Sequence, residues 1–268
     1  MSSALFETRS AGDEERVTEE AIKGGGTTIV AVGGDGTCAH VANAILRTRV
    51  PCKLAVIPCG TGNDFAKTLG VEGYSPKQAA DLVEHDRATP IDVGRIDEHY
   101  FINSCGFGFD ASVLEATRRV HFLKGDAVYI YSALAQLFSY RGISVFADSA
   151  LDSGTRKMLM LTVSNGRFLG GAFRIAPRAS VVDGLLDFGF FGDCNLIDRV
   201  RVFAAALRGT HLGLSSVSTE RARAMTLRFS APPMMEVDGE LRQAKSSTVA
   251  IECVPRALSV IAAPGFPL

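Results

Sequence analysis

The sequence lacks several features that mark specialised classes of protein. It contains no tryptophan, and its 28 basic residues nearly balance its 29 acidic ones, giving a formal net charge of −1. Without a basic excess, we expect neither nucleic-acid binding nor strong attraction to an anionic membrane. No uncharged apolar run reaches transmembrane length, and the acidic segment from Met1 to Glu15 does not resemble a signal peptide. These absences predict a cytoplasmic protein.

The cysteines form no recognisable metal-binding or redox motif. All six are scattered along the chain, with no C-x-x-C pair and no histidine at the spacing of a zinc site. We therefore expect free, buried thiols in a reducing compartment. With 268 residues, 47% of them hydrophobic, the chain is long enough to form one large or two modest domains with a buried core.

A glycine-rich turn separates a predicted strand from a predicted helix near the N-terminus. Residues 27–32 are apolar and β-branched, as in a buried parallel strand, and apolar residues recur at helical spacing over residues 39–46. Between them lies Gly33-Gly34-Asp35-Gly36-Thr37, so we expect the helix to open at Thr37. Glycines let a ligand approach the backbone, and the N–H groups of a helix start favour an anion. The turn is therefore a candidate phosphate site.

The Asp35 carboxylate determines whether a phosphate site here also needs a metal ion or ordered water. A carboxylate about 4 Å from a phosphate charge costs on the order of 4 kcal/mol at an effective dielectric constant near 20. The dipole of the helix start returns only about 0.3–1 kcal/mol. Repulsion therefore dominates unless Mg²⁺ or an ordered water shell lies between the two groups. The alternative is an ordinary glycine turn capped by an aspartate.

A second unit of the same kind follows. Residues 53–57 form another short apolar segment, and a predicted helix runs to about Leu69. Between them lies the polar turn Gly60-Thr61-Gly62-Asn63-Asp64. Two successive strand–turn–helix units predict a parallel sheet with both turns at the carboxyl ends of its strands. The pair favours a site for phosphate and a metal ion over two unrelated turns.

The predicted secondary structure becomes richer in strands after Pro90. Before it, residues 13–23 and 76–85 are predicted helices; after it, strand-like segments dominate. These are residues 91–96, 100–104, 143–147, 157–164 and 226–229, with further helices over 123–139 and 195–208. We expect an N-terminal α/β domain over residues 1–90 and a C-terminal, antiparallel, sheet-rich domain over residues 91–268.

Three shorter segments allow two interpretations each. Residues 106–111 match G-x-G-x-x-A, a dinucleotide fingerprint, but their position favours close packing of a strand against a helix. Glu236-Val237-Asp238-Gly239-Glu240 is either a surface hairpin turn or a pair of functional carboxylates. Asp183-Gly184-Leu185 is either a turn or a set of oxygen ligands for a hard cation.

Taken together, the motifs resemble the diacylglycerol kinase catalytic-domain family of lipid kinases, which includes bacterial lipid kinases and sphingosine kinases. Their order and approximate spacing match over nearly the whole chain. The matching segments are residues 32–37 (VGGDGT), 57–66 (IPCGTGNDFA), 103–111, 165–171, 175–179, 183–187 and 238–240. The first motif alone would also fit NAD kinases and phosphofructokinases, whereas the second favours lipid kinases.

The resemblance implies an ATP-binding α/β domain, a C-terminal β-sandwich, and an active site in the cleft between them. It implies ATP and Mg²⁺ as cofactors and assigns roles to individual residues. Nucleotide contacts would come from Thr8, Gly33, Gly34, Asp35, Gly36, Thr37, Gly60, Thr61, Gly62 and Asn63. Asp35 and Asp64 would organise the metal, Asp238 and Glu240 would be catalytic carboxylates, and Ser180, Asp183 and Leu185 would form an accessory metal site.

The implied reaction is attack of a lipid hydroxyl on the γ-phosphoryl group of ATP, with diacylglycerol as the default acceptor. Either Asp238 or Glu240 would accept the hydroxyl proton. The expected partners are a lipid substrate and, transiently, the membrane surface; nucleic acid is not expected, and the oligomeric state is open, a homodimer included. Two alternatives are a soluble-substrate kinase of the NAD kinase type and a catalytically impaired lipid- or nucleotide-binding protein.

Two departures from the family pattern make the second alternative possible. The chain starts after the point where the family usually has its first strand and an Asn-Pro-x-Ser-Gly-type phosphate loop. Cys38-Ala39-His40 also stands where the family usually has Leu/Ile-Asn-Glu. An amide and an acid near the phosphates are therefore missing.

Overall fold

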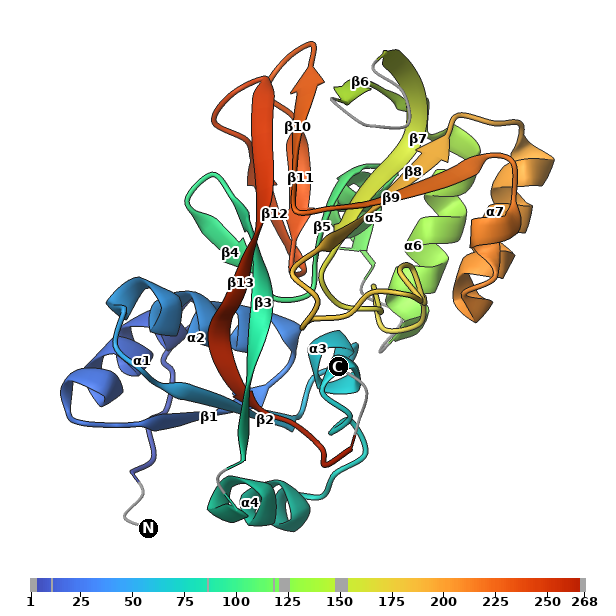
Figure 1. Cartoon of the computed structure of the whole chain (residues 1–268). Helices are drawn as coiled ribbons and strands as arrows, with labels where there is room; N and C mark the ends of the chain where they lie inside the picture. Colours follow the sequence, from blue (N-terminus) through green and yellow to red (C-terminus); the bar gives the residue numbers. More distant parts are fainter. Residues whose placement is uncertain are drawn as a thin grey trace.

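The N-terminal part of the chain forms two parallel strands, each followed by a turn and a helix. The computed structural model describes residues 4–10, 12–85, 87–117, 119–120, 126–147 and 154–265. Strands β1 (Thr28–Gly33) and β2 (Lys53–Pro58) pair in parallel, and helices α2 (Asp35–Thr48) and α3 (Asp64–Thr68) follow them. Helix α1 (Asp13–Lys23) packs on α2, and α4 (Pro76–His85) lies near β2 (Figure 1). The predicted strand–turn–helix units are confirmed.

Two local expectations need correction. Helix α2 begins at Asp35 rather than Thr37, because Gly34 is its extended N-cap, so the Asp35 carboxylate belongs to the first helical turn. All six cysteines are free thiols, but Cys59 is exposed and Cys194 is partly exposed. Cys59 lies in the turn after β2, where the backbone leaves the core, whereas the other four cysteines are buried.

The rest of the chain is dominated by antiparallel strands, as predicted. One expected strand, residues 100–104, divides into two because the chain turns at Ile102 and Asn103. The strands are β3 (Ala88–Ile96), β4 (His99–Phe101), β5 (Ser104–Gly108), β6 (Ile143–Ala147), β7 (Thr155–Ser164), β8 (Leu186–Gly192), β9 (Val217–Ala222), β10 (Ala224–Phe229), β11 (Met234–Val237), β12 (Glu240–Gln243) and β13 (Thr248–Ile261). The helical segments are α5 (Phe109–Thr117), α6 (Asp126–Ser139), α7 (Leu196–Arg208) and the 3₁₀ turn η1 (His211–Gly213).

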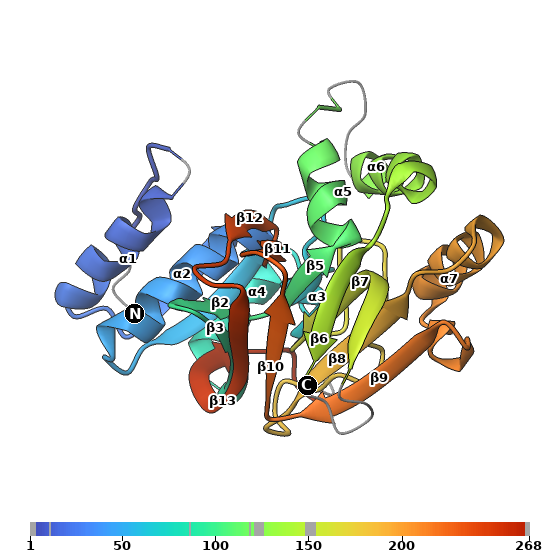
Figure 2. The ribbon, with the colours of Figure 1, turned by 90° about the horizontal axis from the view of Figure 1, so that it is seen from above.

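Separate hydrophobic cores hold these layers together. One lies among the antiparallel strands and includes Phe107, Leu161 and Phe188; a second lies beneath α2 in the N-terminal part. A third packs α5, α6 and α7 against β7 and β8, with Leu137 and Val202 among its buried residues. Figure 2 shows these helices gathered on one side of the antiparallel strands.

Strand β13 joins the two parts of the molecule. Its first half pairs with β10, whereas Ser259 and Val260 pair in parallel with β2, beside β1. Strand β3 runs antiparallel to β13 along most of its length, so the expected domain boundary at residues 88–92 falls inside a strand. The returning C-terminal strand therefore completes the N-terminal sheet, and the two parts share a continuous two-stranded ribbon (Figure 1).

The ribbon has an irregularity where it passes from one core to the other. The register of β13 against β3 shifts between Val254 and Leu258, and Arg256 adopts a left-handed backbone with φ of 53°. Buried Asp92 holds this point, because its carboxylate accepts hydrogen bonds from the N–H groups of Arg256 (2.8 Å) and Gly184 (2.6 Å). Each of its oxygens therefore satisfies a backbone donor of a different segment.

The two glycine turns touch each other at the carboxyl ends of β1 and β2. A Cβ atom built on Gly60 would lie 2.4 Å from the Cα of Gly34, a distance that real Cβ atoms do not reach. The Asn63 side chain closes the second turn by accepting from Gly60 N–H (3.0 Å) and donating to Gly60 C=O (2.8 Å). The prediction that both turns lie at one edge of the sheet is confirmed.

We expect Gly60→Ala to lower the free energy of unfolding by about 1–3 kcal/mol, because the added methyl group forces two backbone segments apart. The matched control is Gly73→Ala, where a Cβ meets nothing within 4 Å, and it should not lower this free energy. Urea unfolding followed by far-ultraviolet circular dichroism measures both, since the chain has no tryptophan to serve as a fluorescent probe. Equal loss in the two variants would contradict the contact.

Candidate active site

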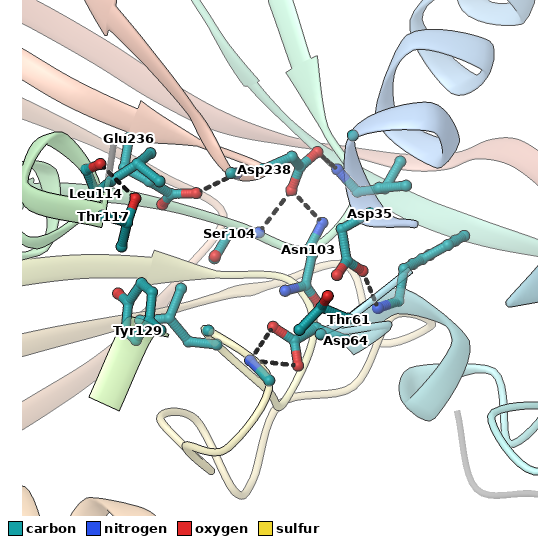
Figure 3. Close-up of a pocket in the computed structure, with 18 of the residues that line it drawn as sticks. Asp35, Thr61, Asp64, Asn103, Ser104, Leu114, Thr117, Tyr129, Glu236 and Asp238 are labelled. Atoms are coloured by element: carbon teal, nitrogen blue, oxygen red, sulfur yellow. Dashed lines mark hydrogen bonds between the residues drawn. The ribbon is translucent and has the colours of Figure 1, made fainter. Parts of the chain in front are cut away.

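A cavity of about 430 Å³ lies where the glycine turns meet the second half of the chain (Figure 3). Its described lining combines acidic side chains with a largely apolar wall. The polar part includes Asp35, Gly36, Thr61, Gly62, Asp64, Asn103, Ser104, Glu236, Asp238 and Gly239. The other wall includes Leu114, Val128, Tyr129 and Leu169, from α5, α6 and the loop after β7. The cavity thus unites acidic groups that are distant in sequence.

Asp35 and Asp64 approach the cavity from the two adjacent helix starts. The Phe65 N–H donates to Asp35 Oδ1 (3.0 Å), so α3 holds the carboxylate of α2 in place. Asp64 is buried and accepts from Gly171 N–H at 3.0 and 3.2 Å and from Lys67 Nζ at 3.3 Å. Lys67 also donates to the carbonyls of Gly62 and Gly171, which fastens the loop after β7 to the second glycine turn.

The two carboxylates disfavour each other's charge. Burial, and after it the negative charge of Asp35, raises the pKa of Asp64 to about 6. A cation between them would relieve both the repulsion and the desolvation. No group of three or more histidine, cysteine, aspartate or glutamate side chains that could hold a metal occurs within the described residues. Two carboxylates fit a hard cation, which can take one or two protein carboxylates and complete its shell with other oxygen ligands and water.

Gly36 and Gly62 leave room beside these carboxylates. A Cβ on Gly36 would meet nothing within 4 Å, and one on Gly62 would lie 3.0 Å from Asp35 Oδ2. Both glycines line the cavity, so their backbones are accessible to a ligand. By contrast, the cavity lining does not include the other predicted residues of the two turns, namely Gly33, Gly34, Thr37, Gly60 and Asn63. Gly34 and Gly60 instead form the contact between the turns. A phosphate group fits this cradle better than a bulky apolar group.

Asp238 lies on the opposite side, at the tip of the β11–β12 hairpin. Its carboxylate accepts three backbone hydrogen bonds, from Ile102 (2.8 Å) to Oδ2 and from Asn103 (2.9 Å) and Ser104 (3.0 Å) to Oδ1. Burial nevertheless raises the pKa of Asp238 to about 7, with the N–H donors acting in the opposite direction. This segment is thus both a hairpin turn and part of the cavity, so the two sequence interpretations are compatible.

Glu236, Asp110 and Tyr129 form a buried acidic cluster that the sequence did not reveal. The Tyr129 hydroxyl donates to Asp110 Oδ1 (2.5 Å), and Gly239 N–H donates to Glu236 Oε1. Burial raises the pKa of Glu236 well above its usual range, and it also raises the pKa of Asp110. Glu236 Oε2 and Asp110 Oδ2 are buried without a hydrogen-bond partner among the described residues. Gly106 makes room for the pair, since its Cβ would lie 1.9 Å from Asp110 Oδ2.

Part of this cluster carried a usable sequence signal. Glu236 belongs to the same motif as Asp238, residues 236–240, which the sequence had already singled out as possible functional carboxylates. Glu236 lies in β11, and Asp238 lies in the turn that follows this strand. Asp110 and Tyr129 carried no such signal, because they reach the cluster from two helices. The glycines of residues 106–111 serve close packing rather than dinucleotide binding: Gly106 accommodates the Asp110 side chain, which the sequence interpretation favoured.

Glu240 and Thr8 lie apart from the other predicted residues. Glu240 is absent from the described cavity lining, and its carboxylate bonds to His40 Nε2 (2.8 Å) and Arg242 (2.6 Å). The hydrogen bond to His40 lowers the pKa of Glu240, while Glu240 and Glu15 together raise that of His40 to about 9. Thr8 is exposed in the segment before α1 and does not line the cavity either.

The residues expected to form an accessory metal site lie on another loop. Asp183 Oδ1 accepts from Leu185 N–H (3.0 Å), and its other oxygen pairs with Arg221. Ser180, Asp183 and Leu185 do not line the described cavity. A cation there would have to compete with the Arg221 guanidinium, and this site stays a prediction.

Both parts of the chain match models of known protein families. Residues 1–96 match the model described as diacylglycerol kinase catalytic domain. Residues 103–262 match the model described as YegS C-terminal NAD kinase beta sandwich-like domain. Within the described residues, no helix is both long and apolar enough to cross a membrane.

Individual relatives agree with these models. The chain is 31% identical over 236 residues to "Diacylglycerol kinase" of Bacillus subtilis (strain 168), covering 87% of this chain and 77% of that one. It is 34% identical over 269 residues to "Probable lipid kinase YegS-like" of Pseudomonas aeruginosa PAO1, covering 99% and 86%. A crystal structure of a diacylglycerol kinase from Bacillus anthracis str. Sterne superposes with a TM-score of 0.71 at 20% identity, covering 97% and 84%. The chain therefore belongs to the family of bacterial diacylglycerol kinases and YegS-like lipid kinases.

Proposed function

We propose that this chain is an ATP- and Mg²⁺-dependent kinase that transfers the γ-phosphoryl group to a lipid hydroxyl, most simply that of diacylglycerol. The observation that carries the proposal is one cavity in which Asp35 and Asp64 face Asp238 beside an apolar wall. The acidic pair suits a metal–phosphate complex, the opposite carboxylate suits a hydroxyl, and the wall suits acyl chains. The name of the Bacillus subtilis relative supports diacylglycerol as the acceptor.

The nucleotide phosphates would occupy the cradle formed by the two glycine turns. Gly36, Thr61 and Gly62 line it and offer backbone N–H groups and a hydroxyl. Asp35 and Asp64 would hold Mg²⁺, which neutralises the charge that develops on the phosphoryl oxygens. Lys67 keeps Asp64 and the facing loop in register through its bonds to Gly62 and Gly171. Positioning of this kind accounts for most of the catalysis of phosphoryl transfer.

Asp238 is the better candidate for the base that accepts the hydroxyl proton. Its three backbone bonds occupy three of about four acceptor positions of a carboxylate, which leaves one on Oδ2. A pKa of about 7 suits a base that works near neutral pH, and such a base contributes about 10²–10⁴-fold to the rate. Glu240, bonded to His40 and Arg242, would instead position the hairpin that carries Asp238.

The apolar wall supports a lipid acceptor. Leu114, Val128 and Leu169 line the cavity opposite the phosphate cradle. A second, apolar cavity of about 50 Å³ adjoins it, and Tyr129 and Leu169 line both. Acyl carbons next to the reacting hydroxyl would bury their surface along this wall, at roughly 25 cal/mol per Å². A nicotinamide dinucleotide would find few polar partners there.

Purified protein given γ-labelled ATP and Mg²⁺ should label diacylglycerol. The same assay, with phosphatidylglycerol, a sphingoid base and NAD as acceptors, identifies the substrate class. Transfer to NAD alone would indicate a soluble-substrate kinase, and the absence of transfer to every acceptor would indicate a binding protein.

Asp35→Asn should reduce phosphoryl transfer by about 10²–10⁴-fold, because it removes one of two charges proposed to hold the metal. Asp81→Asn is the matched control, since Asp81 carries the same group on the exposed surface of α4, outside the cavity; its activity should stay within about threefold of the wild type. Initial rates over a range of Mg²⁺ concentrations measure both. An Asp35→Asn enzyme with undiminished turnover would exclude the proposed metal site.

The pH dependence should follow ionisation of Asp238. Its pKa is raised, so the group is protonated and inactive as a base at low pH and becomes active as the pH rises through about 7. The logarithm of kcat/KM for a water-dispersed acceptor should therefore climb below pH 7 and level off above it. Asp238→Asn should lose about 10²–10⁴-fold on the plateau above pH 7 and should also lose the inflection, whereas Glu240→Gln should keep the inflection. An inflection that disappears only in Glu240→Gln would reverse the assignment.

A further inference from the structure

Helix α6 presents an apolar face outward. Tyr131, Leu134 and Phe138, spaced three and then four residues apart along the helix, are 46%, 40% and 66% exposed. The opposite face packs inward, with Ala133 and Leu137 buried against β7 and β8. No charged residue occurs between Ala127 and Ser139. Exposed faces of helices in soluble proteins normally carry charged residues, so this face is shaped for an apolar contact.

Helix α7 extends this face. It lies beside α6, and the Arg199 guanidinium donates to the carbonyls of Leu137 (3.0 Å) and Tyr140 (2.8 Å) at the end of α6 (Figures 1 and 2). Leu196, Ile197 and Val200 on its first turns are 45%, 67% and 44% exposed. The inner faces of both helices pack on the same strands, so their outer faces point to the same side of the molecule. We call these six exposed residues the α6–α7 patch.

The charges around the α6–α7 patch differ from those of the whole chain. The chain has a net charge of −1, but residues 127–147 and 193–208 together contain the four arginines Arg141, Arg199, Arg201 and Arg208 and the two acids Asp193 and Asp198. Arg199 is 12% exposed and pairs with Asp193, so the exposed basic side chains here are Arg141, Arg201 and Arg208. Asp198 is paired with Arg201 (3.1 Å) and with the Asn195 amide (2.8 Å). An apolar face with a basic margin is complementary to an anionic lipid surface.

The α6–α7 patch also adjoins the proposed acceptor site. Val128 and Tyr129, on the first turns of α6, line the active-site cavity. The apolar cavity that continues from it lies between the inner faces of α6 and α7, where Ala133, Leu137 and Val202 line it. A lipid surface in contact with the α6–α7 patch would therefore place its lipids next to the apolar wall of the active-site cavity.

We propose that the α6–α7 patch is the surface by which this kinase docks on an anionic lipid bilayer; the inference rests on the proposed lipid acceptor. The side chains of Phe138 and Ile197 enter the region between headgroups and acyl chains, while the exposed Arg141 and Arg201 contact lipid phosphates. Diacylglycerol then moves from the bilayer along α6 to Asp238 without crossing water. A second copy of the chain is the less favoured occupant, because a two-fold interface through this patch would bring two sets of exposed arginines together.

Vesicle flotation with the full-length protein, without ATP or acceptor, tests the docking surface. The wild type should float with vesicles of phosphatidylcholine mixed with phosphatidylglycerol, and less so when salt is raised or phosphatidylglycerol is omitted. The double variant Phe138→Ser/Ile197→Ser should bind at least about tenfold more weakly, since both side chains are already exposed and the fold loses little by their removal. Val50→Ser, at an apolar residue 48% exposed near the N-terminal sheet, is the matched control and should bind like the wild type.

Kinase assays on the same proteins separate this proposal from the proposed function. The double variant should lose activity on vesicle-embedded diacylglycerol in proportion to its binding and keep activity on a water-dispersed short-chain diacylglycerol. Equal flotation of the wild type and the double variant would overturn the docking surface even if both are kinases. A wild type that floats through this patch but transfers no phosphate would overturn only the proposed function. Light scattering that shows a dimer converted to a monomer by the double substitution, without vesicle binding, would assign the patch to a second copy.

Discussion

The backbone contact between Gly34 and Gly60 is the constraint on which the rest of the candidate active site depends. It places the starts of α2 and α3 side by side, so that Asp35 and Asp64 share one cavity although their charges repel. Parallel pairing of β1 with β2 and the hydrogen bond from Phe65 to Asp35 maintain this arrangement without a bound ligand. The packing of the fold thus holds the two carboxylates together against their repulsion. A cation bound between them would offset that repulsion.

Each carboxyl group in the cavity has a different environment, and the environment sets what it can do. Asp64 meets an N–H donor and Lys67, Asp238 meets three N–H donors, and Glu236 accepts from the Gly239 N–H and lies near Asp110. Acids of similar intrinsic strength are thereby distributed over distinct protonation states near neutral pH. The same groups exposed on a surface would all be ionised and would offer no such division of labour.

The sequence predicted those parts of the fold that are encoded locally. Helix α4 was predicted with its observed bounds, and both strand–turn–helix units follow from apolar runs and glycines. The sequence did not predict the acidic cluster, because Asp110, Tyr129 and Glu236 meet only through tertiary packing. Nor could it decide between Asp238 and Glu240, since the direction of each side chain depends on the hairpin geometry. The uncharged, apolar sequence of α6 predicts a helix that packs in the core, and only the fold shows that one of its faces is exposed.

Strand β13 has a consequence for how the protein is made. It is the last strand of the chain, yet it lies beside β2 and supplies part of the N-terminal core. During synthesis, β1 and β2 therefore leave the ribosome long before residues 248–261, and the N-terminal sheet lacks its neighbouring strand until β13 has been made.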